Sequence, residues 1–186
     1  MDAWLVYREG VAAHSEFTPE SLVLAQQLYE RAITIDSDFV PARAGLADTY
    51  RAQAQFGFVE ARAAALERGV ELIGEALAMD PDEPIAVAIL STIHIAKQEF
   101  VQAVEAAERA ATLDPNNYLN QGILSYNLVV VGRSDEAIYR AKQAQRLSPI
   151  HADWIENVLG LAYILSGDYA RALATFHVIL DQKPAP

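Results

Sequence analysis

Residues 159–176 read LGLAYILSGDYARALATF, and this stretch decides the fold. Small residues stand in it at fixed distances from bulky ones: Gly160 precedes Tyr163 by three positions, and Ala172 precedes Phe176 by four. Residues three and four apart lie on one face of an α-helix. Two helices can therefore cross closely at the small residues while the rings fill the space beside them. A Ser-Gly-Asp turn signal separates the two halves, so the stretch predicts two antiparallel helices.

The same pattern recurs along the chain. Prolines follow one another at intervals of 34, 34 and 35 residues, at Pro81, Pro115, Pro149 and Pro184. Leucines recur in step, each followed by a small residue, at Leu46, Leu90, Leu124 and Leu159. The position of Ala172 is shared by Ala25, Gly69, Ala103 and Ala137. One helix pair cannot bury both its faces, so stacked pairs predict an all-α solenoid. We expect a single array of about five hairpins, over residues 1–37, 38–81, 82–115, 116–149 and 150–184.

The period of about 34 residues and the order Leu-Gly-x2-Tyr, Ala-x3-Phe and Pro resemble the tetratricopeptide repeat (TPR). The resemblance covers nearly the whole chain, although His94 and Leu128 replace the tyrosine in the third and fourth repeats. It implies a right-handed superhelix in which the first helix of each pair lines a concave face. Partners of TPR proteins usually bind on that face.

Two repeats are irregular. The second has ten extra residues around AQFGFVEARAAA, which predicts longer helices or an elaborated turn. In the first, we expect a helix over residues 2–13 whose inward face holds Trp4, Tyr7 and Gly10. Thr18 is then expected to cap the next helix, with Pro19 in its first turn.

Two longer segments resemble a particular bacterial arrangement. Residues 18–50 resemble the start, and residues 146–176 the end, of the TPR region downstream of class III adenylate or guanylate cyclase domains. Similar arrays follow winged-helix DNA-binding domains in some regulators. The resemblance implies that this chain is the non-catalytic C-terminal part of a larger signalling protein. No cyclase motif or DNA-reading helix is visible in the sequence, so neither activity is carried over.

Composition narrows the function further. There are no cysteines, which excludes disulfides, a thiol nucleophile and a cysteine-based zinc site and fits a cytoplasmic location. The formal net charge of -11 repels nucleic acid and anionic membrane surfaces. The N-terminus does not read as a signal peptide, and no apolar run is long enough to insert into a membrane.

The histidines and acidic residues, which could take part in catalysis or bind a metal, each have a structural explanation. No phosphate loop, His-Glu-x2-His or Gly-x-Ser-x-Gly motif is present. We expect His94 to be packed in the tyrosine position with one hydrogen bond, and Asp153 to cap a helix rather than pair with His151. The remaining acidic pairs stand at helix starts, as Asp135 and Glu136 do behind Ser134. The sequence therefore predicts neither an enzyme nor a cofactor or metal site.

The first helices of the repeats supply the candidate binding residues. By register, the partner-binding groove is expected to hold Asp48, Arg51, Thr92, Ile95, Tyr126, Val129, Asn157 and Leu161. Further positions on this surface are Ala44, Ile85, Ala88, Leu119, Gly122 and Ile164. The surface is apolar apart from its first end, which favours an apolar helix or peptide as the partner. Chaperone-binding TPR proteins use lysine and asparagine to hold a C-terminal carboxylate, and this chain has Ala88, Thr92, Gly122 and Tyr126 at the positions where such residues would be needed. The alternative is that these side chains pack between helices.

The last helix raises a second hypothesis. Phe176, Ile179 and Leu180 have no following helix to cover them, which predicts self-association as a homodimer or contact with a missing segment. The leading hypothesis is a binding module for a protein partner. A structural module that dimerises attached domains is the alternative.

Overall fold

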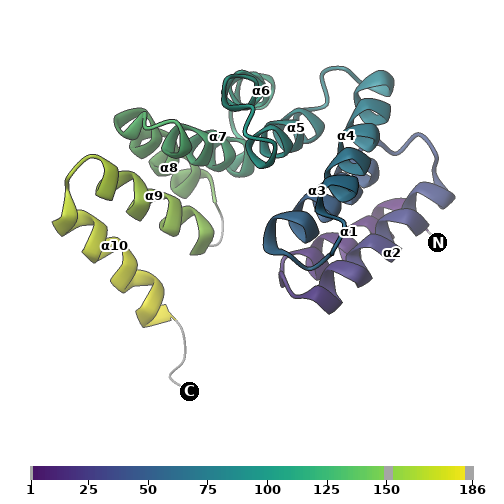
Figure 1. Ribbon diagram of the computed structural model, residues 1–186, viewed down its shortest axis with the longest axis horizontal. Coiled ribbons are helices and arrows are strands. Elements are labelled where there is room, and N and C mark those ends of the chain that lie inside the picture. The colour runs from purple at the N-terminus through teal and green to yellow at the C-terminus, as the bar shows by residue number, and fades with distance from the viewer. Residues whose placement is uncertain (1, 149–152, 183–186) are drawn as a thin grey trace. The chain divides into compact units, whose positions relative to one another are not determined.

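The fold is entirely α-helical in the part of the chain that the computed structural model describes, residues 2–148 and 153–182 (Figure 1). The helices are α1 (Ala3–His14), α2 (Pro19–Ile35), α3 (Val40–Phe56), α4 (Arg62–Met79), α5 (Pro84–Ala96), α6 (Phe100–Leu113), α7 (Tyr118–Val130), α8 (Ser134–Leu147), α9 (Asp153–Leu165) and α10 (Tyr169–Gln182). They fall two by two within the five ranges that the repeats predict. Pro149, His151 and Pro184, on which parts of the sequence-based expectations rest, lie outside the described residues.

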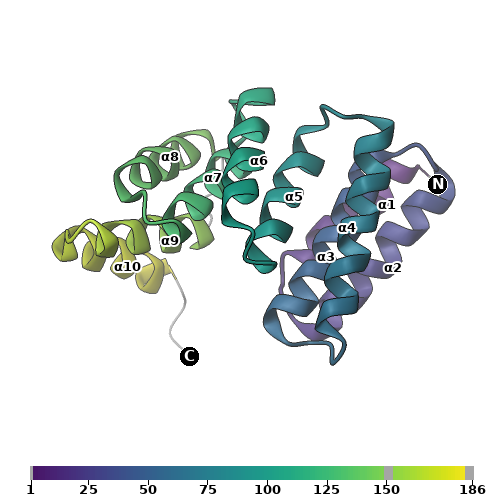
Figure 2. The same cartoon turned by 45° about the horizontal axis from the view of Figure 1, so that its top comes forward.

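The helices form two compact units, residues 1–99 and 100–186. In the N-terminal unit α1 packs on α2 and α3 packs on α4, and α3 also contacts α1, α2 and α5. Figure 2 shows α1 to α4 side by side in this unit. In the C-terminal unit α7 pairs with α8 and α9 with α10, while α6 packs on α7. Each unit has hydrophobic clusters of its own.

The spacing of small and large residues has the physical meaning that the sequence predicts. A Cβ atom added to Gly160 would lie 2.5 Å from Cζ of Phe176, so the ring occupies the space of the missing side chain. Tyr29 holds the same repeat position as Phe176 and lies against both Gly10 and Gly45, where an added Cβ would come within 2.8 and 2.6 Å of its ring. The aromatic ring of one helix thus fills the notch left by glycine on its neighbours.

The irregular repeats are built as follows. Most of the ten extra residues lengthen α3 and α4 to 17 and 18 residues, and the rest lengthen the turn between them, residues 57–61. The expectation of longer helices is confirmed. The predicted start of α2 is also confirmed: Thr18 Oγ1 accepts a hydrogen bond from the Ser21 backbone N–H at 3.1 Å, and Pro19 is the first helical residue.

The expected inward face of α1 is wrong at one position. Trp4 is 48% exposed and lies under the Arg8 guanidinium, whereas Val6 is buried. The buried positions of α1 are Ala3, Val6, Gly10 and Ala13, at the helical spacing of three and four. Trp4 lies one residue away from this face, so its helical angle does not allow the buried position that its large apolar side chain suggests.

Candidate functional site

The eight predicted groove residues all lie on the first helices of their hairpins, on α3, α5, α7 and α9. The N-terminal unit holds Asp48, Arg51, Thr92 and Ile95, and the C-terminal unit holds the other four. Ala44, Ala88 and Gly122, which the register places on the same surface, are buried. Trp154 covers Gly122, since an added Cβ there would lie 2.2 Å from its ring. Those three positions therefore offer no surface to a partner.

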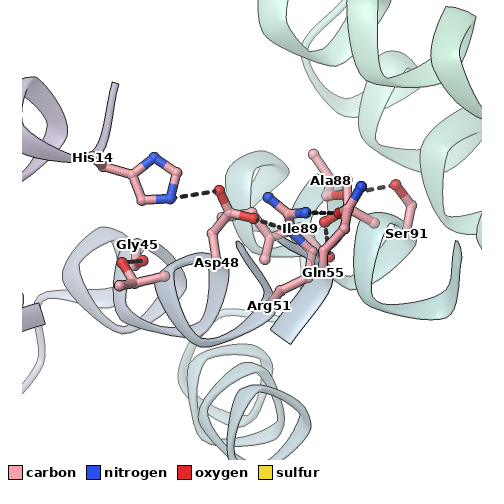
Figure 3. A network of polar contacts seen from close by, with 10 residues as sticks. His14, Gly45, Asp48, Arg51, Gln55, Ala88, Ile89 and Ser91 are labelled. Atoms are coloured by element: carbon pink, nitrogen blue, oxygen red, sulfur yellow. Dashed lines mark hydrogen bonds and ion pairs between the residues drawn. The ribbon is translucent and has the colours of Figure 1, made fainter. Parts of the chain in front are cut away.

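Asp48 and Arg51 belong to a polar network on the N-terminal unit (Figure 3). Nε of Arg51 donates to Oδ1 of Asp48 at 2.5 Å, and Nη1 of Arg51 donates to Gln55 one turn further along α3. Nε2 of His14, at the end of α1, lies 3.2 Å from Oδ2 of Asp48. The carboxylate of Asp48 thus joins α1 to α3 and is held from both sides.

Electrostatics keep this carboxylate ionised. Burial alone would raise the pKa of the Asp48 carboxyl. The Arg51 guanidinium and the His14 imidazole outweigh burial and hold the pKa well below its usual range. Because Asp48 and Arg51 largely neutralise each other and only 10% of the Arg51 side chain is exposed, this network is internal bracing rather than an open anion or cation site.

The other two predicted residues of the N-terminal unit lie on α5. The Thr92 hydroxyl donates to the Ile89 carbonyl at 2.8 Å, so its hydrogen bond stays within its own helix. Its neighbour Ser91 does the same, donating to the Ala88 carbonyl at 2.6 Å (Figure 3). Ile95 is half-buried. Neither Thr92 nor Ile95 therefore has an unused side-chain donor for a partner.

An aromatic cluster at the edge of the polar network was not expected from the sequence. The His14 ring packs edge-on against Phe17, Phe17 packs edge-on against Phe56, and Phe56 stacks on Phe58. The three phenylalanines are 37–51% exposed. Phe17 and Phe58 stand in the turns that follow α1 and α3, and Phe56 is the last residue of α3, where the repeat pattern carries no information. The only signal in the sequence was that bulky apolar residues occupy turn segments.

The predicted residues of the C-terminal unit differ in exposure. Tyr126 and Val129 on α7 are half-buried, and Val129 packs on a cluster that includes Leu128 and Ala162. Asn157 and Leu161 on α9 are exposed, Leu161 by 43%. Leu119 and Ile164, which the register places on the same surface, are exposed to a similar degree, by 38% and 42%. The C-terminal unit therefore carries open apolar side chains on α7 and α9.

The three residues predicted to mediate self-association differ in exposure. Phe176 is half-buried against Gly160, and Ile179 is only 7% exposed, so both belong mainly to the α9–α10 hairpin. Leu180 is 64% exposed. Leu173 and Tyr169 on the same helix are also exposed, by 61% and 69%, although the repeat pattern did not single them out.

The histidines and acids form local pairs. Nδ1 of His94 lies 2.6 Å from Oε2 of Glu99 across the end of α5. Asp135 and Glu136 lie in the first turn of α8, which begins at Ser134. Across residues 2–148 and 153–182, no three histidine, aspartate or glutamate side chains are grouped as metal ligands. None of the helices in this part of the chain has the length and apolarity needed to cross a bilayer.

Comparison with curated proteins finds relatives that match this chain over only part of their own length. No protein-family model matches the sequence. The transcriptional regulators HilA of Salmonella typhimurium and of Salmonella typhi are each 24% identical to it over 152 residues. The match covers 82% of this chain and 27% of the regulator, so the chain spans about a quarter of the length of these relatives.

Comparison with solved structures identifies the fold. TTC0263, a thermophilic TPR protein of Thermus thermophilus, superposes with a TM-score of 0.75 at 22% identity, over 98% of this chain and 92% of that one. MamA of AMB-1 gives 0.57 at 24% identity, over 92% and 94%. YrrB, described as a TPR protein with an unusual peptide-binding site, gives 0.57 at 19% identity, over 97% and 86%. The chain is therefore an all-α solenoid of TPR-like helix hairpins.

Proposed function

We propose that this chain is a non-catalytic protein-interaction scaffold that holds a partner peptide or helix on the first helices of its hairpins. The TPR fold supports the scaffold role, and the peptide-binding site named for YrrB supports a peptide as the kind of partner. The net charge of -11 favours a protein over a nucleic acid.

The observation that carries the proposal is the exposure of apolar side chains on α7 and α9, two helices that contact each other. Leu119, Leu161 and Ile164 lie on first helices and are exposed. The ring of Tyr126, on α7, is half-buried. Isolated exposed leucines are common, but several on neighbouring helices suit the apolar side of an amphipathic helix. The binding face is therefore assigned to the C-terminal unit.

The same proposal includes a place in a longer protein. The HilA regulators match this chain over about a quarter of their length, which supports a role as one part of a larger protein. Its place as the C-terminal regulatory part of a signalling protein belongs to the proposal. The relatives are named as regulators of transcription, so the comparisons favour that context over the cyclase context implied by residues 18–50 and 146–176. The attached domain would supply the activity, and the array would supply the contact with a partner.

Site-directed photo-crosslinking tests the binding face. A benzophenone amino acid placed at Leu161 should capture a discrete partner in cells, identified by mass spectrometry. The matched control is Tyr139 on the second helix α8 of the same unit, which is 58% exposed. Capture of the same proteins from both positions would contradict a specific face on the first helices.

Titration with the captured partner then tests the contact itself. Leu161→Asp should weaken binding by roughly tenfold or more, as truncation of a central apolar contact does. Tyr126→Ala should also weaken binding while the helical content stays unchanged. Unaltered affinity in both variants would overturn the assignment of this face.

A second candidate function is a structural module that dimerises attached domains. The exposed side of α10 favours it specifically, because Leu173 and Leu180 are each more than 60% exposed. This function involves a different helix from the proposed binding face, so the two can coexist.

A further inference from the structure

Helix α10 carries an apolar stripe that its own hairpin does not bury. Tyr169, Leu173 and Leu180 are exposed by 69%, 61% and 64%. Spacings of four and seven residues place all three on one side of the helix. The half-buried ring of Phe176 lies between them along the same side. We call Tyr169, Leu173 and Leu180 the α10 stripe.

The repeat register shows what this side of a second helix does elsewhere in the chain. Leu173 and Leu180 correspond to Ile138 and Gln145 of α8. Ile138 packs on the cluster that contains Leu159 of α9, and Nε2 of Gln145 donates to Oε1 of Glu156 on α9 at 2.7 Å. On α8 this side is therefore the contact with the first helix of the next hairpin.

The second hairpin repeats this arrangement. Val70 and Leu77 hold the corresponding positions on α4. Both pack on the cluster to which α5 contributes Ala86, Ile89 and Ile93. The α10 stripe is thus the continuation of a packing surface that is covered by a following helix on both α4 and α8.

In a second copy, α1 at the opposite end of the array matches that following helix only in part. Gly10 of α1 holds the position of Gly160 of α9, since each faces the ring in the same repeat position. Arg8 and Glu9 therefore stand where α9 has the buried Val158 and Leu159, whereas the exposed Trp4 and Leu5 stand where α9 has Trp154 and Ile155. Covering the α10 stripe with α1 would bury two charges on an apolar surface, which is costly.

We propose that a second copy of this chain covers the α10 stripe through a twofold pairing of α10 with α10. In a twofold interface the same patch of both copies meets at the axis. A charged residue close to the axis would therefore lie next to the same charge of the other copy. The stripe contains no charged residue, and its apolar side chains are complementary to themselves. This dimer does not depend on the binding face of α7 and α9.

The test is the mass of the full chain in solution, measured by light scattering behind size-exclusion over a wide range of concentrations. The unsubstituted chain should have the mass of a dimer. The double variant Leu173→Glu, Leu180→Glu should have half that mass, with helical content verified by circular dichroism. The matched control is Val178→Glu: Val178 is 44% exposed but lies on roughly the opposite side of α10, so this variant should stay dimeric.

Cysteine cross-linking keeps the proposal testable if the glutamate variants fold poorly. The natural chain has no cysteine, so a single Leu173→Cys or Leu180→Cys introduces one thiol per copy. Oxidation should link two chains through at least one of these positions and through Val178→Cys not at all. A monomeric unsubstituted chain would overturn the proposal, and so would a mass that keeps growing with concentration, because that indicates head-to-tail assembly.

Discussion

Gly160 lies where the ring of Phe176 crosses α9, and its missing side chain is what lets the two helices approach. Gly160→Ala places a methyl group 2.5 Å from the ring, so the ring or the helix must move. Overpacking of this kind should lower the free energy of unfolding by about 1–3 kcal/mol. Urea denaturation followed by circular dichroism measures the change.

Gly74 provides the control for that substitution. It lies inside α4 with no atom within 4 Å of an added Cβ, so Gly74→Ala meets no obstacle. Alanine is the better helix former, and the free energy of unfolding should rise by about 0.5–1 kcal/mol. Effects of the same sign at Gly160 and Gly74 would contradict the packing account.

Gln98 is one of two non-glycine residues with a positive φ angle in the described part of the chain, the other being Phe17 in the turn after α1. Gly57, Gly132 and Gly167 have φ angles of 73°, 78° and 80° in the turns after α3, α7 and α9, and Gln98 has 63° in the turn after α5. A side chain is strained in this left-handed region, whereas glycine is not. Gln98→Gly should therefore stabilise the chain by about 0.5–1 kcal/mol, measured by the same denaturation.

The reverse substitution controls for the turn itself. Nothing lies within 4 Å of a Cβ added to Gly132, so Gly132→Ala tests the backbone strain alone. It should lower the free energy of unfolding by about 1 kcal/mol. A destabilised Gln98→Gly variant would mean that the glutamine side chain contributes more than its backbone strain costs.

At the level of helices, the sequence predicts the pairs and their contacts but not the side chains outside the repeated positions. The period predicts the contact between Gly160 and Phe176 because both residues hold positions that recur in the repeats. It gives no warning of Phe56 and Phe58, since the end of α3 and the turn after it are not constrained by the packing that maintains the period. It also misses Asn127, whose Nδ2 donates to the Ala103 carbonyl of α6 at 3.0 Å, because a buried amide takes the place of an apolar contact.

The link between α1 and α3 makes a prediction about acid stability. The folded-state pKa of Asp48 lies below its unfolded value, so its stabilising contribution is present above the unfolded pKa, near 4, and is lost as the pH falls through the folded pKa. Asp48→Asn should lower the free energy of unfolding at neutral pH by about 3 kcal/mol, because it leaves Arg51 without its partner. Below pH 4 the difference between the two proteins should shrink, as denaturation at several pH values would show.

A surface pair provides the comparison. Glu71 pairs with Arg68 on α4 at 2.8 Å, but both side chains are about half exposed. Glu71→Gln should change the free energy of unfolding by less than about 1 kcal/mol at any pH. Equal losses in Asp48→Asn and Glu71→Gln would show that the α1–α3 link is no stronger than a surface ion pair.

On the scale of the whole molecule, regular repeats predict one continuous array, yet the helices group into residues 1–99 and 100–186. The boundary falls between α5 and α6, inside the range 82–115 that the period assigns to one repeat. Sequence periodicity reports which positions face a neighbour, and it contains no measure of how tightly each hairpin is packed. For this reason the division into units could not be read from the repeats.

The two units lead to a prediction about fragments. The largest cluster of the N-terminal unit is built entirely from residues before Phe100, so residues 1–99 should fold alone and unfold cooperatively in urea. A fragment of residues 1–81 lacks α5 and with it the buried Ile89 and Ile93. Loss of their burial should remove on the order of 2 kcal/mol for each side chain. Circular dichroism should therefore show a sharp transition for residues 1–99 and a weaker, earlier one for residues 1–81. Identical transitions would mean that α5 belongs with the helices that follow it.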